Sequence, residues 1–221
     1  MALTKFNFNS FDLTTAASKG IAFNSSANGL ETAAEGSMTL IKTLTASSDS
    51  TISFVHGSSS VVLDNTYPIY VFKYINMHPA TNGDNIHFTV NFRDGSTAYD
   101  ATKTTTFFAD YNNENNSGAG IGYETAHHLA QSTSALNIAK QTGGGSDESN
   151  SGEMTLFNPA STTFVKHFIA RTNVYLAHDV SQTQYVAGYC NVTDAIDGVQ
   201  FAFSSGNIET GTIKLYGIKD S

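Results

Sequence analysis

The stretch VQFAFSSGNIETGTIKLYGIK, residues 199–219, decides the fold class. Apolar residues alternate with small or polar ones on both sides of a glycine-containing turn, at Phe201 and Phe203 before it and at Ile213 and Leu215 after it. A period of two indicates strands with one buried face, and the glycines of the turn can adopt a positive φ. The stretch therefore predicts a C-terminal hairpin in an all-β domain, with its last strand paired inside a sheet.

The same period continues back along the chain to Met38. The segment Ile69–Ile75 is apolar or aromatic on both faces, which is typical of the central strand of a sandwich. About eleven strands are predicted at the spacing of a sandwich or jelly roll, in residues 38–44, 51–55, 69–75, 86–92, 103–111, 136–139, 153–157, 163–170, 185–190, 199–204 and 212–218. We therefore expect a single jelly-roll-like antiparallel β-sandwich over residues 37–221, preceded by an extended N-terminal arm over residues 1–36.

The predicted arm differs from the rest of the chain in composition, because aromatic residues are interleaved with Asn, Ser and Ala without a regular strand pattern. A disordered leader is the alternative, but a fully polar leader would lack aromatic anchors. One helical turn over residues 30–35, closed by Gly36, also fits the sequence. We expect the arm to order against a partner protein through five apolar residues: Phe6, Phe8, Phe11, Ile21 and Phe23.

The composition limits the classes of function. Of the 221 residues, 40% are hydrophobic and 11% aromatic, which is enough for a sizeable core in one domain. Only 14% are charged, against ~25% in ordinary globular domains, and this balance is typical of β-rich secreted or assembled proteins. The net charge of −8, without any Lys or Arg cluster, argues against a nucleic-acid partner, and none is expected. No apolar run approaches the ~18 residues of a membrane span, so no membrane partner is expected.

Cys190 is the single cysteine and lies in a predicted strand, which rules out an internal disulfide and favours a buried, inert thiol over a reactive one.

Two sets of residues are candidate metal ligands. Glu124, His127 and His128 lie within five positions, and if residues 122–131 were helical Glu124 and His128 would share a face at i and i+4. A third ligand would have to come from elsewhere, such as His87 or His167. Because residues 122–131 can equally be a loop, the alternative is a set of polar loop histidines that hydrogen-bond the backbone.

The second set resembles a calcium loop in part. Asp110, Asn112 and Glu114 offer oxygen atoms at alternate positions, but the glycine and the terminal Glu of such a loop are missing. The better-supported alternative is an Asx-rich hairpin loop. The sequence therefore predicts no metal and no other cofactor.

Catalytic chemistry is poorly supported, and we expect no enzyme. A Gly-x-Ser-x-Gly motif is absent, and the 19 acidic residues are scattered over turns rather than paired. Residues 143–145 are three glycines without the Lys and the helix of a phosphate-binding loop, and they are predicted to be a flexible tip.

Tyrosines near predicted loops could stack on sugars, and Tyr111 and Tyr123 are the first candidates for glycan binding. The chain has no Trp, the side chain that most often stacks on sugars, which weakens this hypothesis. The alternative is that these tyrosines are half-buried rim residues.

Four segments carry a resemblance to a known family: YVFKYINMHPAT (residues 70–81), NPASTTFVKHF (158–168), VAGY (186–189) and FSSGNIETGTIKLYGI (203–218). They resemble small virion structural proteins of tailed phages, particularly aquatic ones such as cyanophages, over residues 38–219. The resemblance implies a virion setting and carries over no catalytic residue. The arm lies outside it.

We therefore expect a non-enzymatic structural protein on the exterior of a phage particle, assembled in the host cytoplasm. A head decoration, or cement, protein that binds capsid subunits is favoured, because the sequence has no heptads and no shaft-like repeat. The alternative is a tail-fibre or receptor-binding tip protein with glycan-binding activity. Homo-oligomers, with trimers as one option, fit either placement.

Overall fold

The computed structural model describes residues 20–23, 26, 28–32 and 36–219, and the chain divides into two compact units, Met1–Thr39 and Leu40–Ser221. In the first unit β1 (Ile21–Phe23) pairs antiparallel with β2 (Leu30–Thr32). The expected helical turn over residues 30–35 is therefore wrong for its first three residues, which are a strand, and its remaining three lie outside the described residues. The part of the predicted arm that is described thus contains a short hairpin.

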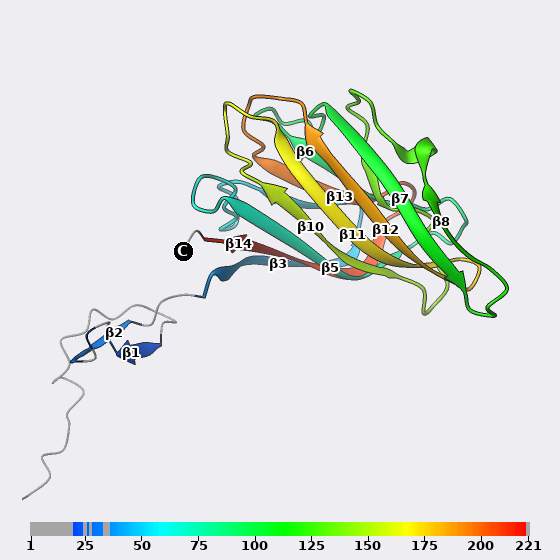
Figure 1. The fold of residues 1–221 in the computed structure, drawn as a ribbon, viewed down its shortest axis with the longest axis horizontal. Helices are drawn as coiled ribbons and strands as arrows, with labels where there is room; N and C mark the ends of the chain where they lie inside the picture. The colour runs from blue at the N-terminus through cyan, green and yellow to red at the C-terminus, as the bar shows by residue number, and fades with distance from the viewer. Residues whose placement is uncertain (1–19, 24–25, 27, 33–35, 220–221) are drawn as a thin grey trace, which may run out of the picture. The chain divides into compact units, whose positions relative to one another are not determined.

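The second unit is a β-sandwich of two antiparallel sheets, as the alternating sequence predicts (Figure 1). The larger sheet has eight strands in the order β3 (Met38–Asp49), β14 (Ile208–Ile218), β5 (Ile69–Pro79), β10 (Asn150–Phe157), β11 (Lys166–Leu176), β12 (Val180–Cys190), β7 (Lys103–Asn113) and β8 (Ala119–Tyr123). The smaller sheet has four strands in the order β4 (Ile52–Val55), β13 (Gly198–Phe203), β6 (Phe88–Arg93) and β9 (Leu136–Ala139). The larger sheet faces the viewer in Figure 1, and β6 and β13 lie behind it.

The C-terminal stretch crosses between the sheets, so the predicted hairpin is wrong. β13 belongs to the smaller sheet and β14 to the larger one, where β14 lies between β3 and β5. Gly206 turns the chain between them with φ +71°, a conformation that favours glycine. The last strand is paired on both sides inside a sheet, which confirms that part of the prediction. The alternation still predicts the buried residues correctly, because the buried faces of both strands point into one shared core.

That core lies between the sheets and is rich in aromatic rings. Phe201 of β13 lies with its ring centroid 5.6 Å from that of Phe72 and 6.4 Å from that of Tyr74, both on β5. The same ring lies 6.4 Å from Phe54 of β4 and 5.8 Å from Phe88 of β6. All five side chains are fully buried. One residue of the opening stretch therefore joins strands of both sheets through the aromatic contacts that stabilise protein cores.

Two segments differ from the sequence prediction. β8 was not predicted as a strand, although it forms a regular antiparallel pair with β7. Residues 143–145 are not a free tip, because Gly143 is buried and its N–H donates to the carbonyl of Tyr175 at 3.0 Å. A Cβ atom on Gly144 would come within 2.7 Å of the Cα atom of Asn82. The glycines are therefore needed for close packing of this loop.

Candidate functional site

The candidate metal ligands Glu124 and His128 lie on either side of a 3₁₀ turn, η2 (Thr125–His127), which follows β8. Glu124 Oε1 forms an ion pair with Lys140 Nζ at 2.6 Å. His128 Nε2 lies 3.0 Å from the carbonyl oxygen of Phe107 and can donate to it. Because the segment is a short 3₁₀ turn and not an α-helix, the i, i+4 pair does not form. The two side chains therefore contact different partners. For His128 this is the alternative stated from the sequence, a loop histidine that hydrogen-bonds the backbone.

His127, the remaining candidate metal ligand, packs against His87, the possible third ligand of the same set. The centroids of the two rings are 5.2 Å apart and the rings are nearly perpendicular at 78°. Nδ1 of His127 accepts from the side-chain amide of Asn137 at 2.8 Å, and Nδ1 of His87 accepts from the backbone N–H of Gln141 at 3.0 Å. Since Nδ1 accepts in both rings, the neutral form of each carries its proton on Nε2.

The surroundings of this pair disfavour protonation. Burial lowers the pKa of His87 to about 4, and the nearby His127 and the positive charge of Lys140 act in the same direction. Burial also lowers the pKa of His127, again assisted by Lys140 and opposed by Glu124. Among the described residues no group of three or more His, Cys, Asp and Glu side chains assembles around a metal position. The arrangement therefore joins η2 to the start of β6 as a neutral, hydrogen-bonded contact.

Sequence reasoning missed the partners that hold this region together. The backbone N–H of Lys140 donates to Gln184 Oε1 at 2.7 Å, and Gln184 Nε2 donates to the carbonyl of Lys140 at 3.0 Å and to Gln182 Oε1 at 2.8 Å. Gln184 is fully buried on β12. This polar network ties the end of β9 to the larger sheet. A single Gln in a strand pattern offers no sequence signal for such a role.

The residues predicted as a partial calcium loop lie on β7 and in the turn after it. Asp110 and Asn112 are exposed on β7, and Glu114 follows it. The amide of Asn113 donates to Ser117 Oγ at 3.1 Å across the turn. The segment is thus an Asx-rich hairpin loop, the alternative stated from the sequence.

The two candidate glycan-binding tyrosines lie on opposite faces of the larger sheet. Tyr123 pairs with Phe108, and Tyr111 pairs with Gly120. Because successive side chains alternate between faces, Phe108 and Tyr111 point in opposite directions. The Tyr111 ring packs over Gly120, where an added Cβ would lie 3.1 Å from ring atom Cε1. The structure does not bring Tyr111 and Tyr123 together, so they cannot form one sugar-binding cluster.

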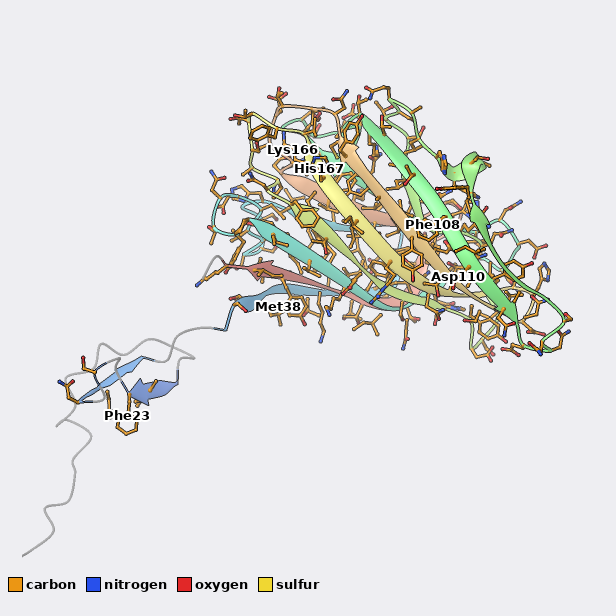
Figure 2. All side chains as sticks on the ribbon, in the orientation of Figure 1. Phe23, Met38, Phe108, Asp110, Lys166 and His167 are labelled. Carbon is orange, nitrogen blue, oxygen red and sulfur yellow. The ribbon has the colours of Figure 1, made fainter. Side chains whose placement is uncertain are left out.

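Exposed apolar side chains gather instead on the outer face of the larger sheet, the face turned away from the core. Tyr123, Phe108 and Tyr185 follow one another on β8, β7 and β12 in register. Figure 2 labels Phe108 and Asp110 on this same face of β7. Ile121 and Tyr123 are 75% and 77% exposed, and Ile169 of β11 is 53% exposed. We call this set the outer patch: Phe108, Ile121, Tyr123, Ile169 and Tyr185.

The geometry of the outer patch bears on what it can bind. The rings of Phe108 and Tyr185 are stacked with centroids 4.8 Å apart and an angle of 10° between their planes. Each ring therefore covers one face of the other. A sugar is bound by stacking on an open aromatic face. The stack leaves less open aromatic face for a sugar at Phe108 and Tyr185, whereas Tyr123 lies outside the stack and is 77% exposed.

A shallow hollow of about 430 Å³ adjoins the outer patch. It forms because Ala187 is small and lies between Thr106 and Ile169 in the register of the sheet. His167, the other possible third metal ligand, lines the hollow beside Tyr189, with ring centroids 6.0 Å apart. His167 is thus on the outer face of the sheet, whereas His127 packs against the buried Phe107.

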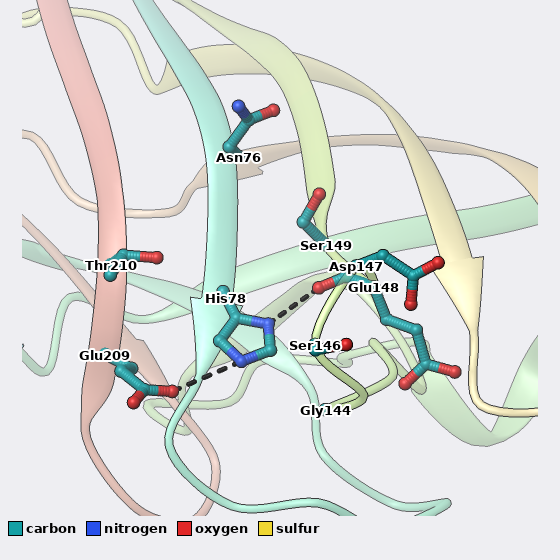
Figure 3. Close-up of a pocket in the computed structure, with 9 residues that line it drawn as sticks. All are labelled: Asn76, His78, Gly144, Ser146, Asp147, Glu148, Ser149, Glu209 and Thr210. Atoms are coloured by element: carbon teal, nitrogen blue, oxygen red, sulfur yellow. Dashed lines mark hydrogen bonds and ion pairs between the residues drawn. The ribbon is translucent and has the colours of Figure 1, made fainter.

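A larger, polar pocket of about 710 Å³ lies where β5, β14 and the loop before β10 meet (Figure 3). Nδ1 of His78 donates to the carbonyl of Glu148 at 2.6 Å, and Nε2 lies 3.2 Å from Glu209 Oε2. The Glu148 carboxylate accepts from the backbone N–H of Gly145. Both ring nitrogens of His78 are therefore engaged, and the imidazole fastens the loop to the sheet rather than facing the pocket as a free base.

Three buried residues lie side by side at one end of the larger sheet. Cys190 pairs in register with Lys166 on β11 and with Lys103 on β7, and all three side chains are 0% exposed. Lys103 Nζ donates to the carbonyl of Ala101 and Lys166 Nζ to that of Val192, each at 2.9 Å. Burial raises the pKa of Cys190 to about 12, which fits the predicted inert thiol. Burial also lowers the pKa of Lys103 to about 8.

The residues proposed to anchor the arm are only partly described. Ile21 and Phe23 lie on β1 and are 59% and 74% exposed. Phe6, Phe8 and Phe11 lie outside the described residues.

Comparison of the chain with protein-family models, with curated proteins and with solved structures finds no match. Within the described part of the chain, no helix has the length and apolarity that a membrane span requires. The fold and the surface together define the class: an antiparallel β-sandwich protein with an exposed apolar patch on the outer face of its larger sheet.

Proposed function

We propose that the chain is a non-enzymatic structural protein on the exterior of a tailed-phage particle, and that it binds another virion subunit through the outer patch. One observation carries the proposal: five large apolar side chains collect on one face of the larger sheet that no other described element of the second unit covers. Exposed apolar surface concentrated in this way is typical of protein–protein contact sites, and Tyr and Phe are enriched at such sites.

The polar clusters support a structural role more than a catalytic one. His78, His87 and His127 each hold a ring nitrogen in a hydrogen bond to the loop or strand next to them. Groups engaged in this way connect elements of the fold. A general base or a nucleophile would instead need a free position facing a substrate.

The virion setting rests on the resemblance of residues 70–81, 158–168, 186–189 and 203–218 to small structural proteins of tailed phages. A head decoration protein that binds capsid subunits is the placement we favour. The described residues contain strands and a three-residue 3₁₀ turn, and they offer no helix for the coiled-coil shaft that a tail fibre commonly uses. Placement in the tail is the alternative, and labelling of intact particles distinguishes the two.

The test is co-sedimentation of the purified full chain with phage particles that lack it. We expect Ile169→Lys to weaken binding at least tenfold, because it places a charge in the outer patch without touching the core. The matched control is Ile75→Lys, which changes an exposed isoleucine on β5 that is 42% exposed and lies outside the patch. Equal binding by both variants and the unchanged chain would contradict the proposal.

A further inference from the structure

β8 is an unprotected edge of the larger sheet. It pairs only with β7 among the described strands, and all five of its residues are exposed. An edge strand presents unpaired backbone N–H and C=O groups that can accept another strand. We propose that β8 is an assembly edge through which two copies of this chain pair antiparallel and join their larger sheets. This inference does not rest on the virion assignment.

The backbone groups that face outward can be identified from two backbone hydrogen bonds at the ends of the β7–β8 pair. The N–H of Asn113 donates to the carbonyl of Gly118, and the N–H of Glu124 donates to the carbonyl of Phe107, each at 2.9 Å. In an antiparallel pair, hydrogen-bonded and non-hydrogen-bonded residues alternate. The even-numbered residues of β8 therefore bond to β7. The outward groups belong to three residues: Ala119, Ile121 and Tyr123.

β8 lacks the features by which proteins block such edges. Its sequence AGIGY contains no charged residue and no proline, and its register with β7 contains no bulge. Charges, prolines and bulges are the usual means of preventing edge-to-edge pairing. The other edge of the sheet, β3, contains Lys42 and Asp49. β8 is the edge that is open to a partner strand.

The strand is also complementary to itself. In a two-fold pair centred on Ile121, each Ala119 lies opposite Tyr123 of the second copy, so that a small side chain faces a large one. The intervening Gly120 and Gly122 face the other side of the sheet and introduce no side chain that could clash. Each of the three outward pairs can exchange two backbone hydrogen bonds. This size match favours a second copy as the partner strand.

Charge does not oppose the pairing. The nearest acidic residue on the outer face is Asp110 of β7, directly beside Ile121. The two copies of Asp110 would be three strand spacings apart, about 14 Å, which exceeds the Debye length of about 8 Å at physiological ionic strength. Repulsion between the two copies of Asp110 is therefore largely screened.

The size of the contact sets its expected strength. A five-residue strand with Ile121 and Tyr123 as its large side chains buries less than the ~1,600 Å² of a standard interface. We therefore expect a reversible dimer with a Kd on the order of 10 μM, and even-numbered rather than trimeric association.

The test is sedimentation velocity of the full chain at concentrations from about 1 to about 200 μM. Ala119→Pro removes one outward N–H and leaves the hydrogen bonds to β7 in place, because the N–H of Ala119 does not face β7. Ile121→Lys places a charge on the edge. We expect both variants to raise the dimer Kd at least tenfold. Ile169→Lys, the matched charge change on β11 of the same face, is expected to leave it unchanged. Circular dichroism and thermal unfolding show whether each variant is folded.

Four outcomes would overturn the inference, and a fifth bears only on the proposed function. A wild-type chain that stays monomeric throughout the range has no assembly edge. If Ile121→Lys leaves the dimer intact, the dimer uses another surface. If only Ile169→Lys abolishes the dimer, the two copies pair through the faces of their sheets. A chain that begins at residue 37 retains the whole core, since every core residue lies between Ala46 and Leu215. Loss of dimers in that chain would assign the partner strand to the arm of the second copy. Loss of particle binding by Ile169→Lys with normal dimers would support the proposed function independently.

Discussion

The side-chain ammonium group of Lys103 lies in the core, where its hydrogen-bond partner is a backbone carbonyl. Its side chain is 0% exposed, and its Nζ donates to Ala101 at 2.9 Å. No carboxylate among the described residues lies within ion-pair distance of it. A buried charge without a counter-charge is costly, and burial accordingly lowers the pKa of Lys103 from 10.5 to about 8. We therefore expect the charge on Lys103 to destabilise the fold at neutral pH relative to an uncharged side chain of similar length.

We predict that Lys103→Met raises the free energy of unfolding by roughly 1–2 kcal/mol at neutral pH, measured by urea denaturation. Methionine keeps much of the side-chain length and removes the charge. Because the folded pKa is lowered, the unfolded chain binds more protons from pH 8 to pH 10.5, so the wild type gains stability as pH rises through that range. The stability advantage of Lys103→Met over the wild type should therefore shrink between pH 8 and pH 10.5. Lys73→Met, at an exposed surface pair, is the control, and a variant no more stable than this control would contradict the argument.

His87 makes the stability of the fold depend on pH in the acid range. Burial, His127 and Lys140 lower the pKa of His87 from 6.5 to about 4. Between these values the unfolded chain binds a proton that the folded chain does not, so stability falls as pH drops from 6.5 to 4. We predict that His87→Asn, whose side-chain oxygen can replace Nδ1 as an acceptor for Gln141, loses less stability between pH 7 and pH 5 than the wild type. Urea denaturation at both pH values measures this loss. His178→Asn, at a side chain 72% exposed, should lose as much as the wild type, and an equal loss in both variants would refute the assignment.

At the scale of single elements, the sequence could predict which residues are buried but not which strands pair. The alternation in residues 199–219 correctly placed Phe201, Phe203, Ile213 and Leu215 in the core. It could not show that β13 and β14 enter different sheets, because both sheets of a sandwich point their buried residues into the same space. Pairing depends on the path of the whole chain.

β8 shows a second limit of the sequence. Glycines at alternate positions leave only Ile121 and Tyr123 as strand-forming residues, and glycine is depleted in strands. The strand is held by its pairing with β7, which is a tertiary effect that no local pattern reports. The same limit applies to the candidate site. The tyrosine pair was predicted from chain proximity, but the register of β7 and β8 places Tyr111 and Tyr123 on opposite faces.

The outer patch could not be foreseen for a related reason. Its members come from β7, β8, β11 and β12, and each is an ordinary apolar residue in an alternating strand. Only the order of these strands in the sheet places Ile169, Tyr185 and Phe108 on one face. The metal hypothesis failed in a similar way, since His87 and His127 do meet but their Nδ1 atoms are engaged by Gln141 and Asn137.

At the scale of the whole molecule, the larger sheet offers two adjoining surfaces with two proposed roles, and these surfaces share Ile121 and Tyr123 of β8. The outer patch lies on a sheet face and is proposed to bind another virion subunit, while β8 lies at the sheet edge and is proposed to pair with a second copy. The core between the sheets holds both in place, because Phe201 and its neighbours fix the sheets against each other.

We propose that the outer patch is buried against another protein in the assembled particle. A cryo-electron microscopy reconstruction of the intact virion tests it most directly. We predict density for this β-sandwich on the outside of the head, with Phe108, Tyr123 and Ile169 in contact with a neighbouring subunit. A reconstruction in which the sandwich is present and these three side chains face solvent would contradict the claim.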